Sequence, residues 1–272
     1  MKKTLIILAA GMGSRFGGIK QIARIGDKGE TLLDLTLQDA ISAGFTDVIY
    51  IIRKEIEEDF KTIIWNNYKD TLHTEYVYQE IEPSRGKPRG TGHALSHALP
   101  VLTSPCLVIN ADDYYGADSM IQASRRLETC KVDTFGMVGY VLDKTLSENG
   151  TVNRGLCTIA DNHLQSITET FWISRTPDGL QDRDGKNVDP QSIASMNFWM
   201  FHDHTLLHLK SEFEKWQLTA KEWEEYYIGL YCNRLIKKFS LECEVLIAQD
   251  NRYGITYKED VEIVRKNLLN NN

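Results

Sequence analysis

The chain has 272 residues, of which 42% are hydrophobic, so it is long enough for one large α/β domain and apolar enough to exclude bulk disorder. Its 31 basic and 38 acidic residues give a net charge of −7, which argues against nucleic acid as a partner, because backbone phosphates require a basic face. The five cysteines are odd in number and include no C-x-x-C pair, so we expect reduced thiols and a cytoplasmic location rather than a disulfide framework.

The first half of the chain alternates between strand-like and helix-like segments. Continuous apolar runs or alternating patterns predict strands at residues 4–8, 48–52, 75–79 and 106–109. Apolar residues at helical spacing predict helices at residues 31–43, 55–65 and 91–99. This alternation predicts right-handed βαβ units and an α/β fold with a mainly parallel central sheet.

The second half has a different pattern, with short strands and then helices. Strands are predicted at residues 138–142, 156–159, 164–168 and 193–201, and helices at 205–216, 221–237 and about 258–269. The polar, Asp/Gly-rich residues 176–189 predict an exposed loop. No linker is evident, so we expect a single domain over residues 1–272, with halves at about 1–133 and 134–260. No apolar run is long enough to cross a membrane.

A glycine-rich loop follows the first strand, and two basic residues follow the glycines. Gly11 and Gly13 let the backbone approach a ligand, so that exposed N–H groups face phosphate oxygens. Arg15 and Lys20 supply positive charge. The dinucleotide fingerprint fails because Phe16 replaces its third glycine, and no Gly-Lys-Ser/Thr P-loop is present. The alternative to a phosphate-binding loop is an ordinary turn between a strand and a helix.

The whole segment resembles the opening motif of the sugar-1-phosphate nucleotidylyltransferases. It reads Leu8-Ala9-Ala10-Gly11-Met12-Gly13-Ser14-Arg15, followed by Lys20. The resemblance implies a Rossmann-like three-layer α/β/α sandwich. It also implies that the backbone at residues 8–13 holds the base and ribose, while Arg15 and Lys20 hold the triphosphate and stabilise the transition state. Ile19 departs from the usual proline, and the spacing from Arg15 to Lys20 is short.

A second matching block is Gly90-Thr91-Gly92-His93-Ala94, which follows Gln79 after a ten-residue loop. In the family this block is typical of members that bind a pyrimidine, so the resemblance assigns Gln79, Gly90 and Thr91 to the nucleotide. A glutamine amide offers a donor and an acceptor, which suits uracil, and we therefore favour UTP. The loop at 80–89 carries three basic residues and is either a solvated surface or a flap over phosphates.

A third block, Val108-Ile109-Asn110-Ala111-Asp112-Asp113, ends a predicted strand. The resemblance implies that Asp112 binds Mg²⁺ at the α-phosphate, with Asp113 as a candidate helper; a pair of turn or N-cap aspartates is the alternative. Gly254 aligns with the aspartate that is the second metal ligand in many members. Either Asp250 replaces that aspartate, or Mg²⁺ depends on Asp112 and the phosphates, as its preference for retained waters allows.

Weaker matches in the second half imply that Gly155, Glu169 and Asn197 contact the acceptor. The expected reaction is attack by an acceptor phosphate on the α-phosphorus of a nucleoside triphosphate, with release of pyrophosphate and little need for a general base. A sugar 1-phosphate is the favoured acceptor. The nearest alternative is cytidylyl transfer to phosphocholine or an aminoalkyl phosphonate, for which aromatic side chains would bind the cation. Candidates for such contacts are Tyr114, Tyr115, Tyr140 and Trp172.

Two other classes stay open. A dinucleotide-dependent oxidoreductase conflicts with the missing third glycine, and a non-catalytic nucleotide sensor would not need Arg15, Lys20 and Asp112 together. The sequence also leaves a homo-oligomer open.

Overall fold

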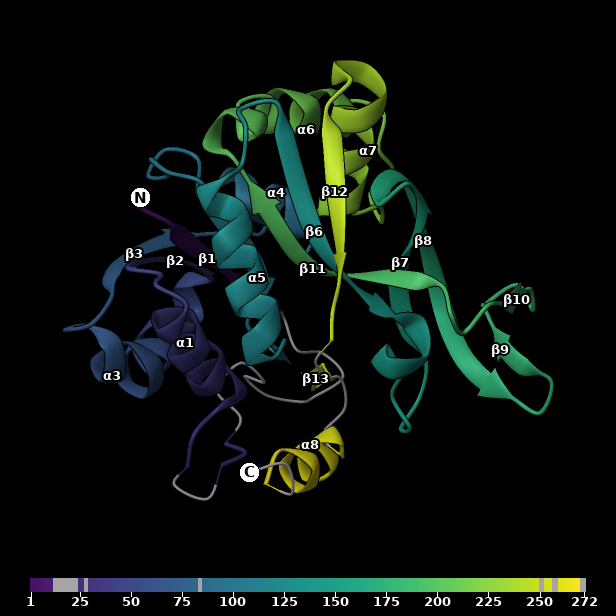
Figure 1. The fold of residues 1–272 in the computed structure, drawn as a ribbon, viewed down its shortest axis with the longest axis horizontal. Coiled ribbons are helices and arrows are strands. Elements are labelled where there is room, and N and C mark those ends of the chain that lie inside the picture. Colours follow the sequence, from purple (N-terminus) through teal and green to yellow (C-terminus); the bar gives the residue numbers. More distant parts are fainter. Residues whose placement is uncertain (12–23, 27–28, 83–84, 250–251, 256–258, 270–272) are drawn as a thin grey trace.

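The structure is a computed structural model that describes residues 1–11, 24–26, 29–82, 85–249, 252–255 and 259–269. Within this part of the chain, eleven strands form one sheet, and helices lie on both of its faces (Figure 1). None of the described helices has the length and apolar character that a bilayer crossing requires.

The first half supplies four parallel strands in the order β3-β2-β1-β4. They are β1 (Thr4–Leu8), β2 (Asp47–Ile52), β3 (His73–Tyr78) and β4 (Cys106–Asn110). Strands β1, β2 and β4 are buried almost throughout, which explains their continuous apolar runs, whereas β3 is the edge strand. The connecting helical segments are α1 (Leu32–Ser42), η2 (Lys54–Ile56), α2 (Glu57–Phe60), η3 (Lys61–Trp65), α3 (Asn66–Tyr68) and α4 (Thr91–Ser96).

The sheet continues from β4 into the second half. Strand β11 (Ile193–Phe201) runs antiparallel between β4 and β6 (Thr134–Val141), and β12 (Glu242–Ile247) is parallel to β6. Along β3-β2-β1-β4-β11-β6-β12, only β11 is reversed, so the prediction of a mainly parallel sheet is confirmed. The helical segments here are α5 (Ala117–Glu128), η4 (Leu142–Thr145), η5 (Asp203–Leu206), α6 (Leu209–Gln217) and α7 (Ile228–Phe239).

Alternate residues of β1 face opposite helical layers. Leu5 and Ile7 belong to a buried cluster with side chains of α1 and α5. Ile6 and Leu8 belong to a second cluster with side chains of α4, α6 and α7. Because successive side chains of a strand point to opposite faces, these two cores define three layers. The predicted α/β/α sandwich is therefore confirmed.

Two sequence predictions are wrong in the second half. Residues 176–189, expected to be an exposed loop, contain β9 (Gly179–Gln181) and β10 (Asn187–Val188), which extend an arm built from β7 (Val152–Ala160) and β8 (His163–Thr176). The helix predicted at 221–237 begins only at Ile228. Residues 221–227 are held away from helical geometry because Tyr226 N–H donates to Arg89 O (2.7 Å) and Tyr226 O accepts from Gly92 N–H (2.8 Å).

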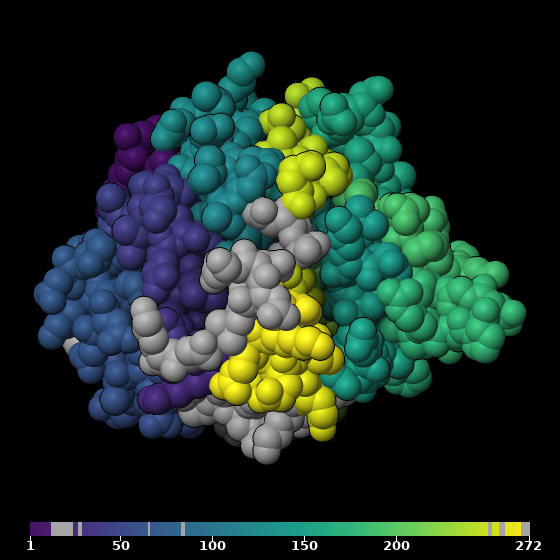
Figure 2. Space-filling view, turned by 60° about the horizontal axis from the view of Figure 1, so that its bottom comes forward, coloured from purple at the N-terminus to yellow at the C-terminus, as the bar shows by residue number. Residues whose placement is uncertain are grey.

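The end of the chain returns to the carboxyl end of β4. Strand β13 (Tyr253–Gly254) pairs with β5 (Asp113–Tyr114), and α8 (Asp260–Leu269) follows. Helix α8 lies on the surface between the two halves (Figure 2). Its Val264 packs with Ile25 of the first half, and its Asp260 accepts a hydrogen bond from Ser147 of the second half (3.0 Å).

Candidate active site

Two adjoining pockets lie beyond the carboxyl ends of the parallel strands, where open α/β sheets bind ligands. The first, called the Gln79 pocket, has a volume of about 370 Å³. The second, called the Glu169 pocket, has a volume of about 310 Å³ and is bounded by β7, β8 and β11. Five residues line both pockets: Thr91, Asn110, Asp112, Asn197 and Glu225. A ligand in one pocket would therefore touch a ligand in the other along this shared wall.

Most of the predicted site residues that the structure describes line these pockets. The Gln79 pocket contains Leu8, Ala10, Gly11, Gln79, Gly90 and Thr91. The Glu169 pocket contains Gly155, Glu169 and Asn197, and Asp112 lines both. Ala9 is different, because its side chain is in the core and its N–H donates to Ile51 O (2.8 Å). Gly13, Arg15, Lys20 and Asp250 lie outside the described residues.

The amide orientation of Gln79 follows from its neighbours. Gln79 is buried, and its Nε2 lies 3.3 Å from Gly90 O and 3.3 Å from His93 Nδ1. A carbonyl only accepts, so the nitrogen of the amide faces Gly90, and His93 Nδ1 accepts its second proton. Burial, with His97 beside it, lowers the pKa of His93 to about 4, so the ring is neutral at pH 7. Gln79 Oε1 is then the atom left to accept from a ligand.

The glycines of the second sequence block have a packing role. A β-carbon on Gly90, which has φ +95°, would lie 2.8 Å from Tyr226 O, and one on Gly92 would lie 2.7 Å from the Tyr226 ring. Thr91 Oγ1 accepts from Ile228 N–H (3.1 Å) at the start of α7. This block therefore joins α4 to the segment that precedes α7, in addition to forming pocket wall.

The basic loop at 85–89 is bound to that same segment rather than solvated. Arg85 donates to Glu224 O (2.8 Å) and to the carbonyl of Glu222. Lys87 forms an ion pair with Glu225 (3.1 Å), and both side chains line the Gln79 pocket. The described part of the loop thus forms one rim of this pocket.

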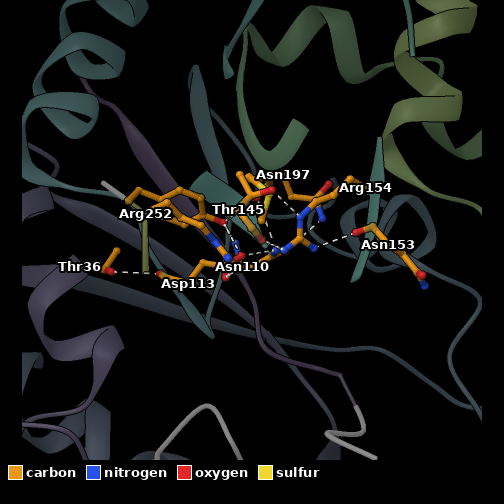
Figure 3. Close-up of polar contacts among 10 residues, drawn as sticks. Thr36, Asn110, Asp113, Thr145, Asn153, Arg154, Asn197 and Arg252 are labelled. Atoms are coloured by element: carbon orange, nitrogen blue, oxygen red, sulfur yellow. Dashed lines mark hydrogen bonds and ion pairs between the residues drawn. The ribbon is translucent and has the colours of Figure 1, made fainter. Parts of the chain in front are cut away.

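A hydrogen-bonded chain connects β11 to the end of β4 (Figure 3). Asn197 Nδ2 donates to Asn110 Oδ1 (3.2 Å), and Asn110 Nδ2 donates to Asp113 Oδ2 (2.9 Å). Asn197 has φ +58° and lies where the register of β11 shifts against β6. The bulge places an asparagine, which tolerates this conformation, in the wall shared by both pockets.

Asp113 forms an ion pair with Arg252, and both side chains are deeply buried. Sequence reasoning considered Asp113 as a helper for the metal and did not identify Arg252. The structure instead gives Asp113 three partners: Arg252, Asn110 and the Tyr115 hydroxyl at 3.4 Å. Asp113 is therefore occupied within the protein.

Gly254, which the alignment places at the position of the usual second aspartate, lies beside Asp113. It pairs with Asp113 across β13 and β5, and Ile255 N–H donates to Asp112 O (3.1 Å). A β-carbon on Gly254 would collide with the Arg252 guanidinium and with the Asp113 carboxylate. The guanidinium thus takes the space that a carboxylate on residue 254 would occupy.

The described donors fit only a magnesium site with few protein ligands. No group of three or more His, Cys, Asp or Glu side chains is arranged to hold a metal ion in the described ranges. Mg²⁺ commonly retains waters and binds through one or two carboxylates plus substrate phosphates. Asp112, at the junction of the two pockets, suits such a site.

Strand register aligns the residues of the Glu169 pocket. Gly155 of β7 pairs with Glu169 of β8 on one side and with Ser195 of β11 on the other. A β-carbon on Gly155 would lie 3.3 Å from Glu169 Oε1, and one on Gly229 of α7 would lie 3.2 Å from it. The two glycines leave space for this carboxylate. Burial raises the pKa of Glu169 to about 7.

Aromatic side chains in the Glu169 pocket differ from those expected. Phe171 and Tyr227 line it, whereas Tyr115 and Tyr140 are in the core and Trp172 is largely exposed. Tyr115 OH donates to Met196 O (2.8 Å), which explains its burial. The expectation that Tyr115 and Tyr140 contact an acceptor is therefore wrong.

Arg154 is a second site residue that sequence reasoning missed. It lines the Glu169 pocket next to Asn153 and Gly155. Its Nε donates to Thr145 Oγ1 (3.0 Å), one terminal nitrogen donates to Asn153 O (2.8 Å), and the other to Thr145 O. The only sequence signal was its position next to Gly155, which the resemblance assigns to the acceptor.

Comparison with known proteins agrees with this arrangement. No curated protein sequence matches the chain. It is similar in fold to a protein from Bacillus anthracis assigned as a glucose-1-phosphate thymidylyltransferase and solved with sucrose, with a TM-score of 0.71 and 14% identity over 97% of this chain and 94% of that one. It is also similar to a UDP-glucose pyrophosphorylase solved with UDP-glucose, with a TM-score of 0.67 and 17% identity over 100% of both chains.

The likeness to these two structures concerns the fold alone. The family is given by the sequence, because the model of the nucleotidyl transferase family matches residues 4–224. This range includes β1 and its glycine loop, Gln79, Asp112 and the strands of the Glu169 pocket. The chain belongs to the nucleotidyl transferase family.

Proposed function

We propose that this enzyme transfers a nucleotidyl group from a nucleoside triphosphate, with UTP favoured, to a sugar 1-phosphate and releases pyrophosphate. The observation that carries the proposal is the position of Asp112 in the wall shared by the Gln79 and Glu169 pockets. A nucleotide in the first pocket and an acceptor in the second would bring the α-phosphorus and the acceptor phosphate together at this carboxylate.

The orientation of Gln79 supports uracil or thymine as the base. Its Oε1 is an acceptor and suits the ring N–H of either base, whereas cytosine presents a lone pair at the same ring position. The backbone at Gly90 is the proposed second contact to the base edge. Both similar structures are named for uridine or thymidine nucleotides, which agrees with this choice.

The proposed chemistry needs positioning and charge neutralisation more than proton transfer. An acceptor phosphate oxygen attacks the α-phosphorus, the bond between the α-phosphorus and its bridging oxygen breaks, and pyrophosphate leaves with that oxygen. The acceptor phosphate is already ionised at neutral pH, so no strong base is required. Mg²⁺ at Asp112 would neutralise phosphate charge. Arg15 and Lys20, outside the described residues, are proposed to hold the triphosphate.

The Glu169 pocket supports a hydroxyl-bearing acceptor. Glu169 and Asn197 offer carboxylate and amide groups, which pair with hydroxyls that both donate and accept. Gly155 leaves the space that the Glu169 carboxylate occupies beside β7. We therefore propose a sugar 1-phosphate as the acceptor.

One observation favours a second candidate, cytidylyl transfer to phosphocholine or an aminoalkyl phosphonate. The Glu169 pocket contains Glu225, Phe171 and Tyr227 as well as Glu169. Carboxylates and aromatic rings together suit a cationic group. The orientation of Gln79 weighs against cytosine, so this candidate stands second.

A pyrophosphate-release screen tests the proposal. Purified enzyme with Mg²⁺ would be offered UTP, TTP, CTP, ATP and GTP against sugar 1-phosphates, phosphocholine and aminoethylphosphonate. We expect release with UTP or TTP and a sugar 1-phosphate. Release confined to CTP with a cationic acceptor would favour the second candidate. No productive pair would contradict both and leave a nucleotide-binding sensor.

A further inference from the structure

Arg154 is half-buried and carries a positive charge that its hydrogen-bond partners do not neutralise. Its three hydrogen bonds go to the hydroxyl and carbonyl of Thr145 and to the carbonyl of Asn153, all of them uncharged. It makes no ion pair with any residue that the structure describes. A guanidinium has five N–H donors, so one donor on each terminal nitrogen is left for a ligand.

The surroundings make this charge costly in the absence of an anion. Arg154 is half-buried, and the cation of Arg252 lies near it, as do the carboxylates of Asp113 and Asp112. Burial first, and then Arg252, lower the pKa of Arg154 below the usual arginine range. Buried charges in proteins are normally paired or bound to a ligand, because desolvation without a partner is unfavourable.

The two carboxylates in the same region are engaged elsewhere. Asp113 is paired with Arg252. Asp112 is the proposed magnesium ligand, and a bound metal would use its negative charge. The summed positive charge of two arginines and a divalent metal would then exceed the negative charge of the two aspartates. An anionic ligand would therefore be attracted to this part of the pocket.

The position of Arg154 indicates which anion it would bind. It lies in the wall of the Glu169 pocket but not in that of the Gln79 pocket. Arg154 is next to Gly155 in β7. Across the pairing with β8, Arg154 lies opposite Thr170, and Gly155 lies opposite Glu169. Arg154, Glu169 and Asp112 thus line one ligand-sized space, and Arg154 also borders the neighbouring pocket that Thr145 and Arg252 line.

We propose that Arg154 anchors the phosphate or phosphonate group of the acceptor through its two remaining N–H donors, and that Thr145 holds the guanidinium in place for this contact. This inference rests on the proposed function, because it takes the ligand of the Glu169 pocket to be the acceptor. It adds the residue that distinguishes a phosphorylated acceptor from its phosphate-free counterpart.

Steady-state kinetics of Arg154→Gln would test the anchor. Loss of a charge-assisted contact should raise the KM for the sugar 1-phosphate by roughly 10- to 100-fold, and the KM for UTP should change by less than about twofold. Arg175→Gln is the matched control, because Arg175 lies on the adjacent strand β8, is mostly exposed and pairs with Asp143. An unchanged acceptor KM, or a larger effect on UTP than on the acceptor, would overturn the inference.

Arg154→Lys is a second variant that keeps the test valid if Arg154→Gln fails to fold. Lysine retains the charge but replaces the planar fork with a single point, so the acceptor KM should rise by several-fold with the UTP KM unchanged. Circular dichroism would first establish that each variant is folded. A lysine variant with the acceptor KM of the wild type would count against the anchor.

Binding of inorganic phosphate separates this inference from the proposed function. Isothermal titration without nucleotide should give at least one phosphate site in the wild type and in Arg175→Gln, and one site fewer in Arg154→Gln. If no substrate pair turns over but this difference is found, the proposed function fails and the anion site stands. Identical phosphate binding by all three proteins would remove the site, even if turnover is found.

Discussion

Arg252 and Asp113 form an ion pair in which the side chains are only 8% and 3% exposed, at the end of the strand that carries Asp112. The two residues are 139 positions apart in the sequence. The pair therefore fastens the end of the chain to the carboxyl end of β4. Removal of one partner would leave the other charge buried without compensation.

We expect Arg252→Met to lower the free energy of unfolding by about 3–5 kcal/mol, and Asp113→Asn with Arg252→Met to cost clearly less than the sum of the single changes. Urea denaturation of the four proteins in the cycle gives the coupling energy. The exposed pair Arg175–Asp143 is the matched control and should show a coupling of at most about 1 kcal/mol. Equal coupling in both pairs would contradict a structural role for the buried one.

Asp112→Ala should abolish pyrophosphate release in magnesium, because Asp112 is the carboxylate in the wall shared by the two pockets. Retained binding of UTP by the variant, measured by titration, would separate lost chemistry from lost folding. Asp133→Ala is the control, since Asp133 is exposed in a turn. Near-normal release by Asp112→Ala would sink the assignment of this residue to the metal.

The pKa of Glu169, raised to about 7 by burial, predicts a pH effect on the acceptor. Below about pH 7 the side chain is protonated and loses acceptor capacity, so the KM for the acceptor should rise as pH falls, while the KM for UTP changes little. Glu169→Gln should remove the part of this dependence that is centred near pH 7 and leave the part due to protonation of the acceptor phosphate, whose second pKa is about 6. A pH profile of the acceptor KM that is the same in wild type and variant would contradict the role of Glu169.

The same shift has a consequence for stability. The folded carboxyl binds its proton more tightly than the unfolded one, so its contribution favours folding at low pH and is lost as pH rises from about 4.5 to 7. Glu169→Gln should therefore be more stable than the wild type at pH 8, by on the order of 1–3 kcal/mol. Thermal unfolding at pH 5 and pH 8 measures the difference.

Local pattern was sufficient for the parts of the fold that are buried on both sides. Strands β1, β2 and β4 are continuous apolar runs, so their positions and their parallel direction were predicted from the sequence, whereas their order in the sheet was not. The helix predicted at 221–237 failed because its first residues meet Arg89 and Gly92, which are distant in the sequence. Periodicity carries no information about such contacts.

The same distinction between local pattern and distant contacts applies to the residues of the candidate site. Gln79, Asp112 and Glu169 lie in blocks that resemble those of the family, so the sequence alone predicted them as site residues, and the structure places them in the walls of the two pockets. Arg154 and Arg252 were not, because what distinguishes them is burial and the identity of neighbours far along the chain. An arginine in a polar stretch is ordinarily a surface residue.

His93 is expected to control base selection through Gln79. His93→Leu removes one of the two acceptors that hold Gln79 Nε2 and leaves only Gly90 O, so the amide is held less firmly and the preference for UTP over CTP in kcat/KM should fall by roughly tenfold. His93→Asn supplies a carbonyl oxygen near the place of Nδ1 and should retain most of the preference. Loss of activity with both nucleotides but an unchanged ratio would mean that His93 only maintains packing.

Gly90 and Gly86 offer a test of why glycine is present in the second sequence block. Both have positive φ, at +95° and +66°, but Gly90 also has ψ 175°, a combination that is essentially restricted to glycine, so an alanine at Gly90 carries strong backbone strain of its own. A β-carbon at Gly90 would lie 2.8 Å from Tyr226 O, whereas one at Gly86 meets no atom within 4 Å. Gly90→Ala should therefore lower the free energy of unfolding by about 1–3 kcal/mol more than Gly86→Ala.

Gly90→Ala should also weaken UTP binding, because the segment before α7 carries Glu225 into both pockets. Urea denaturation and UTP titration of the two variants measure both effects. If the two alanines cost the same and UTP binds both equally, then neither the backbone conformation of Gly90 nor its close approach to Tyr226 has a part in the site.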